Sequence, residues 1–213
     1  MNFENMRLNY DMGTLERQDL NPNPIAQFQD WFELARAKTS SESEANAMVL
    51  ATADADGVVS ARTVLLKSVD EGFVFYSNYD SVKARALLAN PKAALVFYWH
   101  GLQRQVRVQG SVEKVDRELS NSYFQSRPYG SQIGAWLSPQ SQAIPSRSFL
   151  EERQAEMEAR FPEANVALPD FWGGYRLLPN YLEFWQGRVN RLHDRFAYTL
   201  SAEGEWLIER LAP

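Results

Sequence analysis

Short runs of β-branched and aromatic residues recur along this sequence, and they restrict its fold more than any other feature. Turn-forming peptides such as "DADG", "SVDEG" and "NP" separate them. About eight or nine short strands with few long connections indicate an antiparallel barrel with helices packed outside. We therefore predict a mainly β fold, an antiparallel barrel with peripheral α-helices. The runs are "AMVLATA", "VVSARTVLL", "GFVFYS", "KAALVFYWH", "RQVRVQGSVEKV", "GGYRLLP", "YLEFWQG", "NRLHDRFAYTL" and "EWLIERL".

Helical patterns precede and interrupt these runs. Pro24 is suited to the first turn of a helix, and apolar residues recur at helical spacing through "PIAQFQDWFELARA". The peptide "SVKARALLAN" predicts a short helix that is capped by Asp80 or Ser81 and ends before Pro91. Residues 116–161 indicate three helical pieces, which "SRPYGS" and "LSPQSQAIPS" separate.

The domain organisation is simple, because no repeat, low-complexity tract or linker divides the chain. Residues 1–23 are polar and contain the turn-forming peptide "NPNP", so we expect a mobile N-terminal arm there rather than a core element. Residues 24–213 are then a single domain, of a size that is ordinary for one hydrophobic core.

Composition narrows the classes of function. The 213 residues carry a net charge of −5, which disfavours nucleic acid or an anionic membrane surface as a partner. No apolar run approaches the roughly 20 residues of a membrane span. The chain has no cysteine and only two histidines, His100 and His193, so we expect no metal site. The polar start "MNFENMRLNY" is unlike a signal peptide, and we expect a cytoplasmic protein.

Positive charge gathers in the peptide "NRLHDRF", residues 190–196. If this peptide is a strand, side chains alternate between its faces, and Arg191, His193 and Arg195 share one face. Two readings stay open at this point. The face is either a solvated strand edge or part of a site for an anion.

Other cations lie beside hydroxyl groups in the sequence. Arg62 and Lys67 are at the two ends of "RTVLLK". Tyr123, Arg127 and Ser131 are spaced by four, so one helix would bring them together. Guanidinium and hydroxyl groups suit the oxygens of a phosphate, and two separate phosphate pockets are therefore conceivable.

A set of uncommon peptides resembles a known family. In order along the chain they are "RTVLLK", "FYSN", "QRQVRVQG", "YFQSRPYGSQIGAW", "SPQSQ", "FWGGYRLLP", "EFWQG" and "RLHDRF". Together they resemble pyridoxine/pyridoxamine 5′-phosphate oxidase, over nearly the whole chain. The resemblance implies a homodimeric split β-barrel that binds FMN at the subunit interface. It also implies oxidation of pyridoxamine or pyridoxine 5′-phosphate to pyridoxal 5′-phosphate, with dioxygen as electron acceptor and hydrogen peroxide as product.

The resemblance further implies which residues bind the cofactor. A position at a helix start, that of Lys83, is suited to a phosphate. The implied FMN residues are Arg62, Thr63, Val64, Leu65, Leu66, Lys67, Tyr76, Ser77, Lys83, Gln105, Gln140, Ser141, Trp185 and Arg195.

The implied substrate site and mechanism follow in the same way. The resemblance implies that a hydride passes from C4′ of the substrate to flavin N5, with Arg191 positioning the pyridine ring and His193 orienting its substituents. Glu44 matches an acidic position near the reacting centre. The implied substrate-binding residues are Arg7, Tyr10, Lys67, Tyr123, Arg127, Ser131, Arg191 and His193, with Arg191 and His193 also catalytic.

One position departs from the family pattern. Relatives commonly carry an arginine immediately before the lysine of the helix start, and here that residue is Val82. Either Arg85, one turn further, supplies the missing charge, or FMN binds more weakly. Two rival functions also stay open: a related flavin oxidase of the phenazine type, and a non-catalytic protein that binds FMN or pyridoxal phosphate.

Overall fold

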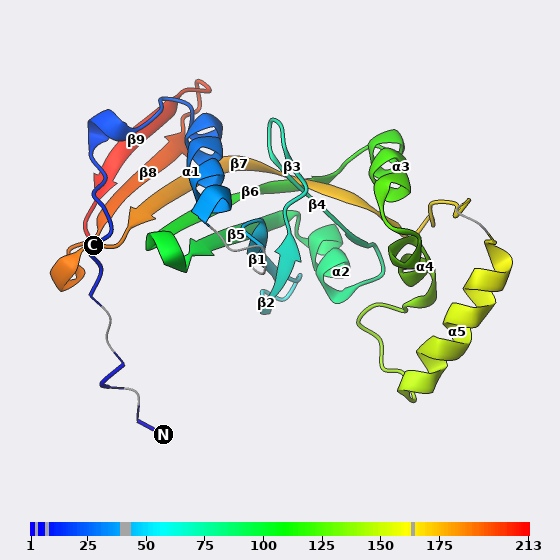
Figure 1. The fold of residues 1–213 in the computed structure, drawn as a ribbon. Coiled ribbons are helices and arrows are strands. Elements are labelled where there is room, and N and C mark those ends of the chain that lie inside the picture. The colour runs from blue at the N-terminus through cyan, green and yellow to red at the C-terminus, as the bar shows by residue number, and fades with distance from the viewer. Residues whose placement is uncertain (3, 7–8, 39–43, 163–164) are drawn as a thin grey trace.

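The computed structural model describes residues 1–2, 4–6, 9–38, 44–162 and 165–213. Within these residues, nine strands form one curled antiparallel sheet with helices around it (Figure 1). This arrangement confirms the predicted mainly β fold. The strands are β1 Ala47–Ala53, β2 Val59–Leu65, β3 Ser68–Val69, β4 Phe73–Asn78, β5 Lys92–Trp99, β6 Arg104–Lys114, β7 Trp172–Gln186, β8 Asp194–Leu200 and β9 Trp206–Leu211.

The longest strand, β7, organises the sheet. The strand order is β2-β1-β5-β6-β7-β4-β3, and β8 pairs with both β7 and β9. The first half of β7 pairs with β4, whereas its second half pairs with β8. β4 and β8 therefore lie along the same edge of β7, one at each end, while β6 pairs along the other edge. The sheet extends in two directions from this strand.

The sequence pattern predicts two separate runs within β7, and that division is wrong. Pro179 ends the first run, and proline usually ends a central strand because it lacks an N–H donor. The register with β6 shifts at this point, from Gln109 opposite Tyr181 to Gly110 opposite Pro179. Asn180 is the extra residue, so a β-bulge accommodates the proline and the strand continues.

The helices begin and end close to where the sequence predicts. Ser81 caps α2 through its side chain, which accepts a hydrogen bond from the Ala84 N–H. The break at "SRPYGS" separates α3 from α4, and these two helices gather with α5 at one end of the sheet (Figure 1). The helices are α1 Pro24–Lys38, α2 Val82–Ala89, α3 Arg117–Ser126, α4 Tyr129–Leu137 and α5 Arg147–Arg160, with 3-10 turns η1 Arg17–Asp19, η2 His100–Leu102 and η3 Val189–Arg191.

The main core lies between α1 and the sheet. Phe28 of α1 contacts the rings of Phe73 and Phe97, with centroids 4.9 Å away in each case. Trp31 packs edge-on against Phe184 of β7. Aromatic side chains therefore fix α1 on the sheet, through both apolar burial and ring geometry.

The segment before α1 differs in part from expectation. Leu15 and Leu20 are buried in the main core, although the sequence predicted an arm without core residues. The mobility of residues 1–23 stays a prediction. Among the described residues, no helix is both long and apolar enough to cross a membrane.

Candidate active site

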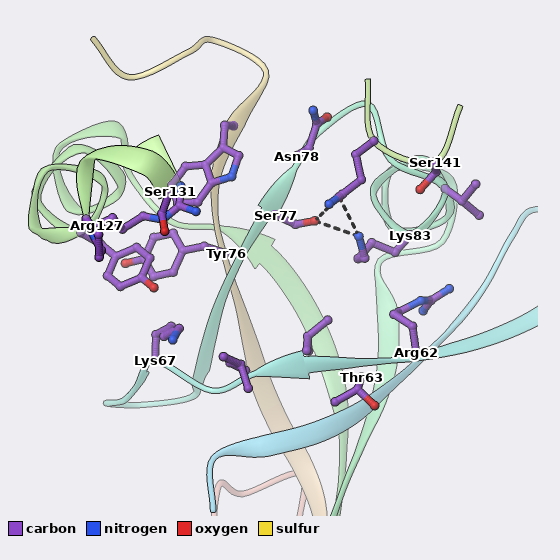
Figure 2. A pocket seen from close by; sticks show the side chains of 17 residues that line it. Arg62, Thr63, Lys67, Tyr76, Ser77, Asn78, Lys83, Arg127, Ser131 and Ser141 are labelled. Carbon is purple, nitrogen blue, oxygen red and sulfur yellow. Dashed lines mark hydrogen bonds between the residues drawn. The ribbon is translucent and has the colours of Figure 1, made fainter. Parts of the chain in front are cut away.

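A pocket of about 740 Å³ opens between the end of β2, strand β4, the start of α2 and the α3–α4 turn (Figure 2). It brings together most of the predicted cofactor residues and one group of the predicted substrate residues. Those predicted residues are Arg62, Thr63, Val64, Leu65, Lys67, Tyr76, Ser77, Lys83, Tyr123, Arg127, Ser131, Gln140 and Ser141. Asn78, Val82, Pro128 and Trp172 complete the lining.

Lys83 forms one side of the pocket. Its Nζ lies 3.0 Å from Ser77 Oγ, 3.0 Å from Gln140 Oε1 and 3.3 Å from Ser81 Oγ. All three acceptors are neutral. Burial, and to a smaller extent the positive charge of Arg62, lower the pKa of Lys83 to about 8. A buried ammonium that faces neutral partners and a second cation is suited to an anionic ligand.

Arg62 reaches the same side from β2. Its Nη1 donates to Leu50 O at 2.9 Å and to Thr52 Oγ1 at 3.0 Å, both on the neighbouring strand β1. Its Nη2 donates to Ser60 Oγ. Burial lowers the pKa of Arg62 from its ordinary value. These bonds fix the guanidinium, which lies near Lys83 in Figure 2.

The opposite side of the pocket is a stack of aromatic rings. The ring centroids of Tyr76 and Tyr123 are 4.0 Å apart, and those of Tyr76 and Trp172 are 5.5 Å apart. The Arg127 guanidinium lies 4.8 Å from the Trp172 ring, and Lys67 Nζ lies 5.9 Å from the Tyr123 ring. Two cations therefore flank the stack, in positions that cation–π attraction favours.

Arg127 Nη1 is buried and has no hydrogen-bond partner among the described residues. Burial lowers the pKa of Arg127, and Tyr123 opposes that effect. Its backbone is held by Gln132, whose Nε2 donates to Arg127 O at 3.0 Å. An unpaired buried donor is costly unless a ligand accepts from it, so this atom marks a place for an anionic oxygen.

The helical reading of Tyr123, Arg127 and Ser131 is wrong in its geometry. The helix α3 ends at Ser126, and α4 begins at Tyr129. Arg127 therefore lies in the turn between two helices, because proline at position 128 disfavours a helical conformation in the residue before it. All three residues nevertheless line the pocket.

A second group of predicted residues lies elsewhere on the chain. Trp185 is opposite Gln105 on β6 and opposite Arg195 on β8. The His193 ring lies 4.6 Å from the Trp185 ring and 5.8 Å from the Tyr10 ring. These five residues do not line the pocket in the described part of this chain.

The expected strand face of Arg191, His193 and Arg195 is not formed. Strand β8 begins only at Asp194, and Val189–Arg191 is a 3-10 turn. Asn190 and Arg191 have φ angles of 56° and 62°, which belong to the left-handed region. Two such residues in succession turn the chain and postpone pairing with β7, so the three side chains do not alternate along one strand.

Burial and two neighbouring charges shift the pKa of His193. Burial lowers its pKa, the positive charge of Arg191 lowers it further, and Asp194 opposes both. Arg195 is held from two directions, because its Nε donates to Glu183 Oε1 at 2.9 Å and its Nη1 donates to Ala212 O at 2.7 Å. The imidazole of His193 is thus held towards its neutral form.

Four predicted residues remain, of which three are described and do not line the pocket. Arg7 lies outside the described residues. Glu44 is exposed, and Leu66 is buried in the main core with its backbone N–H bonded to Asn46 O. Arg85 donates to Asp80 O, and among the described residues it is not part of the lining.

Sequence reasoning missed Asn78 and Trp172 as lining residues, although both lie in the quoted peptides "FYSN" and "FWGGYRLLP". The pair of glycines that follows Trp172 was the available signal. A Cβ on Gly174 would lie 2.8 Å from the Tyr76 ring, so only glycine allows the aromatic stack to form. Among the described residues, no group of three or more acidic or histidine side chains could hold a metal ion.

Comparison with solved structures places the fold. PhzG from Burkholderia lata, solved in complex with tetrahydrophenazine-1-carboxylic acid, matches with a TM-score of 0.86 and 29% identity, over 96% of this chain and 100% of that chain. An FMN-binding protein from Nostoc punctiforme, related to pyridoxamine 5′-phosphate oxidase, matches with a TM-score of 0.71 and 18% identity, over 91% of this chain and 98% of that chain. The split-barrel fold is thereby confirmed.

Comparison of sequences gives the family. Proteins named pyridoxine/pyridoxamine 5′-phosphate oxidase from Cupriavidus necator and Burkholderia thailandensis are 52% and 54% identical, each over 98% of this chain and 97% of the relative. A profile described as "Pyridoxine 5′-phosphate oxidase C-terminal dimerisation region" matches residues 172–213. A profile described as "Pyridoxamine 5′-phosphate oxidase" matches residues 36–161. This chain therefore belongs to the pyridoxamine 5′-phosphate oxidase family of enzymes.

Proposed function

We propose that this protein is an FMN-dependent oxidase that converts pyridoxamine and pyridoxine 5′-phosphate to pyridoxal 5′-phosphate. Dioxygen is the electron acceptor, and hydrogen peroxide is released. One observation carries the proposal: the pocket has two separate pairs of cations, Arg62 with Lys83 on one side and Lys67 with Arg127 on the other. Two phosphorylated molecules, a cofactor and a substrate, account for both pairs.

The side of Lys83 fits the phosphate of FMN. The buried ammonium, the Arg62 guanidinium and the hydroxyl of Ser77 converge there, and Lys83 lies in the first turn of α2. Charge-assisted hydrogen bonds to a phosphate would replace the neutral contacts of Lys83. The volume of about 740 Å³ is within the range of sites that hold a cofactor-sized ligand.

The side of Arg127 fits the phosphate of the substrate. The unpaired Nη1 of Arg127 needs an acceptor, and Lys67, Tyr123 and Ser131 supply further donors on the same side of the pocket. The planar guanidinium binds two phosphate oxygens at once, which orients the ligand. This side therefore selects substrates that carry a phosphate.

The reaction balances with the amine and with the alcohol. Bound FMN supplies the hydride acceptor, and dioxygen takes the two electrons and two protons as hydrogen peroxide. The amine substrate loses a hydride from carbon and a proton from nitrogen, and water hydrolyses the resulting imine to aldehyde and ammonia. The alcohol loses its hydroxyl proton instead. In this proposal Arg191 positions the ring, and neutral His193 holds its substituents.

Arg191 and His193 reach a pocket only in a homodimer. Both residues lie within 172–213, the region that matches a dimerisation profile, and neither lines the pocket in the described part of the same chain. In the proposed dimer, Trp185, Arg191, His193 and Arg195 of one copy complete the pocket of the other. FMN then lies at the subunit interface.

Aerobic turnover tests the reaction. The purified protein with FMN is expected to produce pyridoxal 5′-phosphate and hydrogen peroxide from both phosphorylated substrates. Pyridoxine and pyridoxamine without phosphate are the controls, and Arg127→Met is expected to raise the KM of the phosphorylated substrates by about tenfold or more. FMN binding without any turnover would establish instead a protein that only binds its ligand.

A second candidate function is oxidation of a reduced phenazine, which the structural match to PhzG favours. That ligand carries a carboxylate and no phosphate. Turnover of tetrahydrophenazine-1-carboxylic acid, unaffected by Arg127→Met, would select this alternative over the proposed substrate.

Mixed dimers test the shared site. One chain carries Lys83→Met with Arg127→Met, and the other carries Arg191→Ala. If sites are shared, each pocket is completed by Arg191 of the other chain. The mixed dimer then has one intact site and about half of the wild-type activity. If each chain holds a complete site, the mixed dimer is inactive.

A further inference from the structure

We propose that Gln103 is a positioning residue that docks residues 9–12 against His193. The inference rests on the proposed function, because it assigns His193 to the substrate site. Gln103 is absent from every residue group implied by the resemblance, and it does not line the pocket in the described part of the chain. Its side chain acts on the segment that carries Tyr10.

The Gln103 side chain holds the backbone on both sides of Tyr10. Its Oε1 accepts hydrogen bonds from the Asp11 N–H at 2.9 Å and from the Met12 N–H at 3.1 Å. Its Nε2 donates to Asn9 O at 3.4 Å. One amide therefore satisfies three backbone groups that no helix or strand pairs, since residues 9–12 lie outside regular structure.

The backbone of Gln103 is itself fixed to the end of β7. Its φ of 51° and ψ of 41° are left-handed, and it closes the 3-10 turn η2. Its carbonyl oxygen accepts from the Gly187 N–H at 2.8 Å and from Gln186 Nε2 at 3.3 Å. A side chain in this strained conformation points in a defined direction, because the surrounding bonds determine it.

Docking places the Tyr10 ring on the His193 group. The ring centroid of Tyr10 lies 5.8 Å from Trp185 and 5.8 Å from His193. A Cβ on Gly187 would lie 3.0 Å from Tyr10, so the contact with this strand end is close. The Tyr10 side chain also hydrogen-bonds to Tyr98 of β5; burial and this hydrogen bond raise the pKa of Tyr98 to about 12.

A second anchor follows the first along the chain. The Leu15 N–H donates to Asp194 Oδ2 at 3.1 Å, and Asp194 is the residue after His193. The same carboxylate pairs with Arg188 at 2.8 Å and Arg210 at 2.9 Å. Gln103 and Asp194 therefore tie the segment to both sides of the His193 turn, and Gln103 is the anchor that holds the backbone on both sides of Tyr10.

Hydrogen exchange tests the docking without any turnover. Gln103→Asn tolerates the left-handed conformation but shortens the side chain. It is expected to speed exchange of the Asp11 and Met12 amides by about tenfold or more, since both lose their acceptor. Gln103→Glu retains that acceptor and loses only the donor to Asn9, so those two amides are expected to stay protected. Gln154→Ala, at an exposed glutamine of α5, is the matched control.

Kinetics test the consequence for the site. Gln103→Asn is expected to raise the KM for the phosphorylated substrate about threefold to tenfold, with the Kd for FMN unchanged. Gln103→Glu is expected to have a KM close to that of the wild type. The proposal is overturned if exchange at Asp11 and Met12 is unchanged, or if it accelerates while KM stays at the wild-type value. Because exchange needs no reaction, a failure of the proposed function would leave that result intact.

Discussion

The backbone N–H of Arg188 donates a hydrogen bond to Nδ1 of His193, with 3.1 Å between the two nitrogens. A neutral imidazole that accepts at Nδ1 carries its proton on Nε2, so this bond selects one tautomer. The Nε2–H is then the donor available to a ligand. Protonation of Nδ1 would break the bond, which agrees in sign with the lowered pKa of His193.

His193 is expected to titrate below the ordinary histidine value of 6.5. Burial and Arg191 both disfavour its charged form and outweigh Asp194, so the imidazole stays neutral at pH 7. The unfolded chain takes up this proton first, and the stability contributed by His193 falls as the pH drops through 6.5. Proton NMR of the two histidines measures the midpoint, with His100→Gln for assignment. Arg191→Gln is expected to raise it; a midpoint above 6.5 in the wild type would contradict the assignment.

FMN affinity is expected to fall as the pH rises above about 8. Without FMN the pKa of Lys83 is lowered to about 8, so its ammonium loses a proton in this range and no longer pairs with a phosphate. Linkage of one proton weakens binding by up to about tenfold per pH unit there. Flavin fluorescence titrations at several pH values measure the effect.

Lys83→Met is the control for that titration. It is expected to weaken FMN by about 1.5–3 kcal/mol at pH 7 and to remove the pH dependence. Without FMN, this variant is expected to melt no lower than the wild type, because burial of the lysine charge is unfavourable. Equal pH dependence in wild type and variant would place the titrating group elsewhere.

Val82→Arg is expected to tighten FMN binding by about tenfold, because a further charge-assisted hydrogen bond becomes available beside Lys83. Val82 lines the pocket and is 44% exposed, so a longer side chain has room. Val82→Met adds length without charge and is expected to leave the Kd unchanged. Equal affinity for the arginine variant and the wild type would show that Arg62 and Lys83 already saturate the phosphate.

Glu183→Gln is expected to lower the free energy of unfolding by about 1–3 kcal/mol and to weaken FMN. The side chain of Glu183 is 2% exposed and bonds to both Arg107, at 3.1 Å, and Arg195, at 2.9 Å. Loss of the Glu183 charge leaves Arg107 and Arg195 without this counter-ion. Arg195, which we expect at the cofactor, is then no longer held in place. Denaturant unfolding measures the first effect.

The matched control for this substitution is Glu113→Gln. Glu113 pairs with Arg176 at 3.1 Å, but its side chain is 48% exposed. A surface pair contributes less than about 1 kcal/mol, so unfolding and FMN binding are expected to change little. Equal losses of unfolding free energy and FMN affinity in the two variants would show that Glu183 has no special role.

Local sequence signals predicted most elements of the fold. Pro24 and Ser81 mark helix starts that the structure reproduces, because both act within one helical turn. Pro179 misled the strand prediction, since the bulge that accommodates it depends on the register with β6. The left-handed angles of Asn190 and Arg191 were equally hidden, because neither residue type requires them.

The site was predictable in composition and not in arrangement. Resemblance brought Lys83 and Arg127 to attention, and the structure places both in one pocket. The distance of His193 from that pocket arises from pairing of β7 with β4 and β8 at different ends, which no local pattern encodes. The anchoring contacts of Gln103 join residues 91 and 92 positions apart, and they were likewise beyond local reasoning.

The single strand β7 has a consequence for how activity depends on concentration. Trp172, beside the phosphate pocket, and Trp185, beside His193, lie near opposite ends of its 15 residues, which puts them on the order of 45 Å apart along the strand. One flavin is too short to touch both. Under the proposed function, each chain contributes its phosphate pocket to one active site and its His193 group to the other. Dilution that separates the two chains therefore abolishes the activity of both sites.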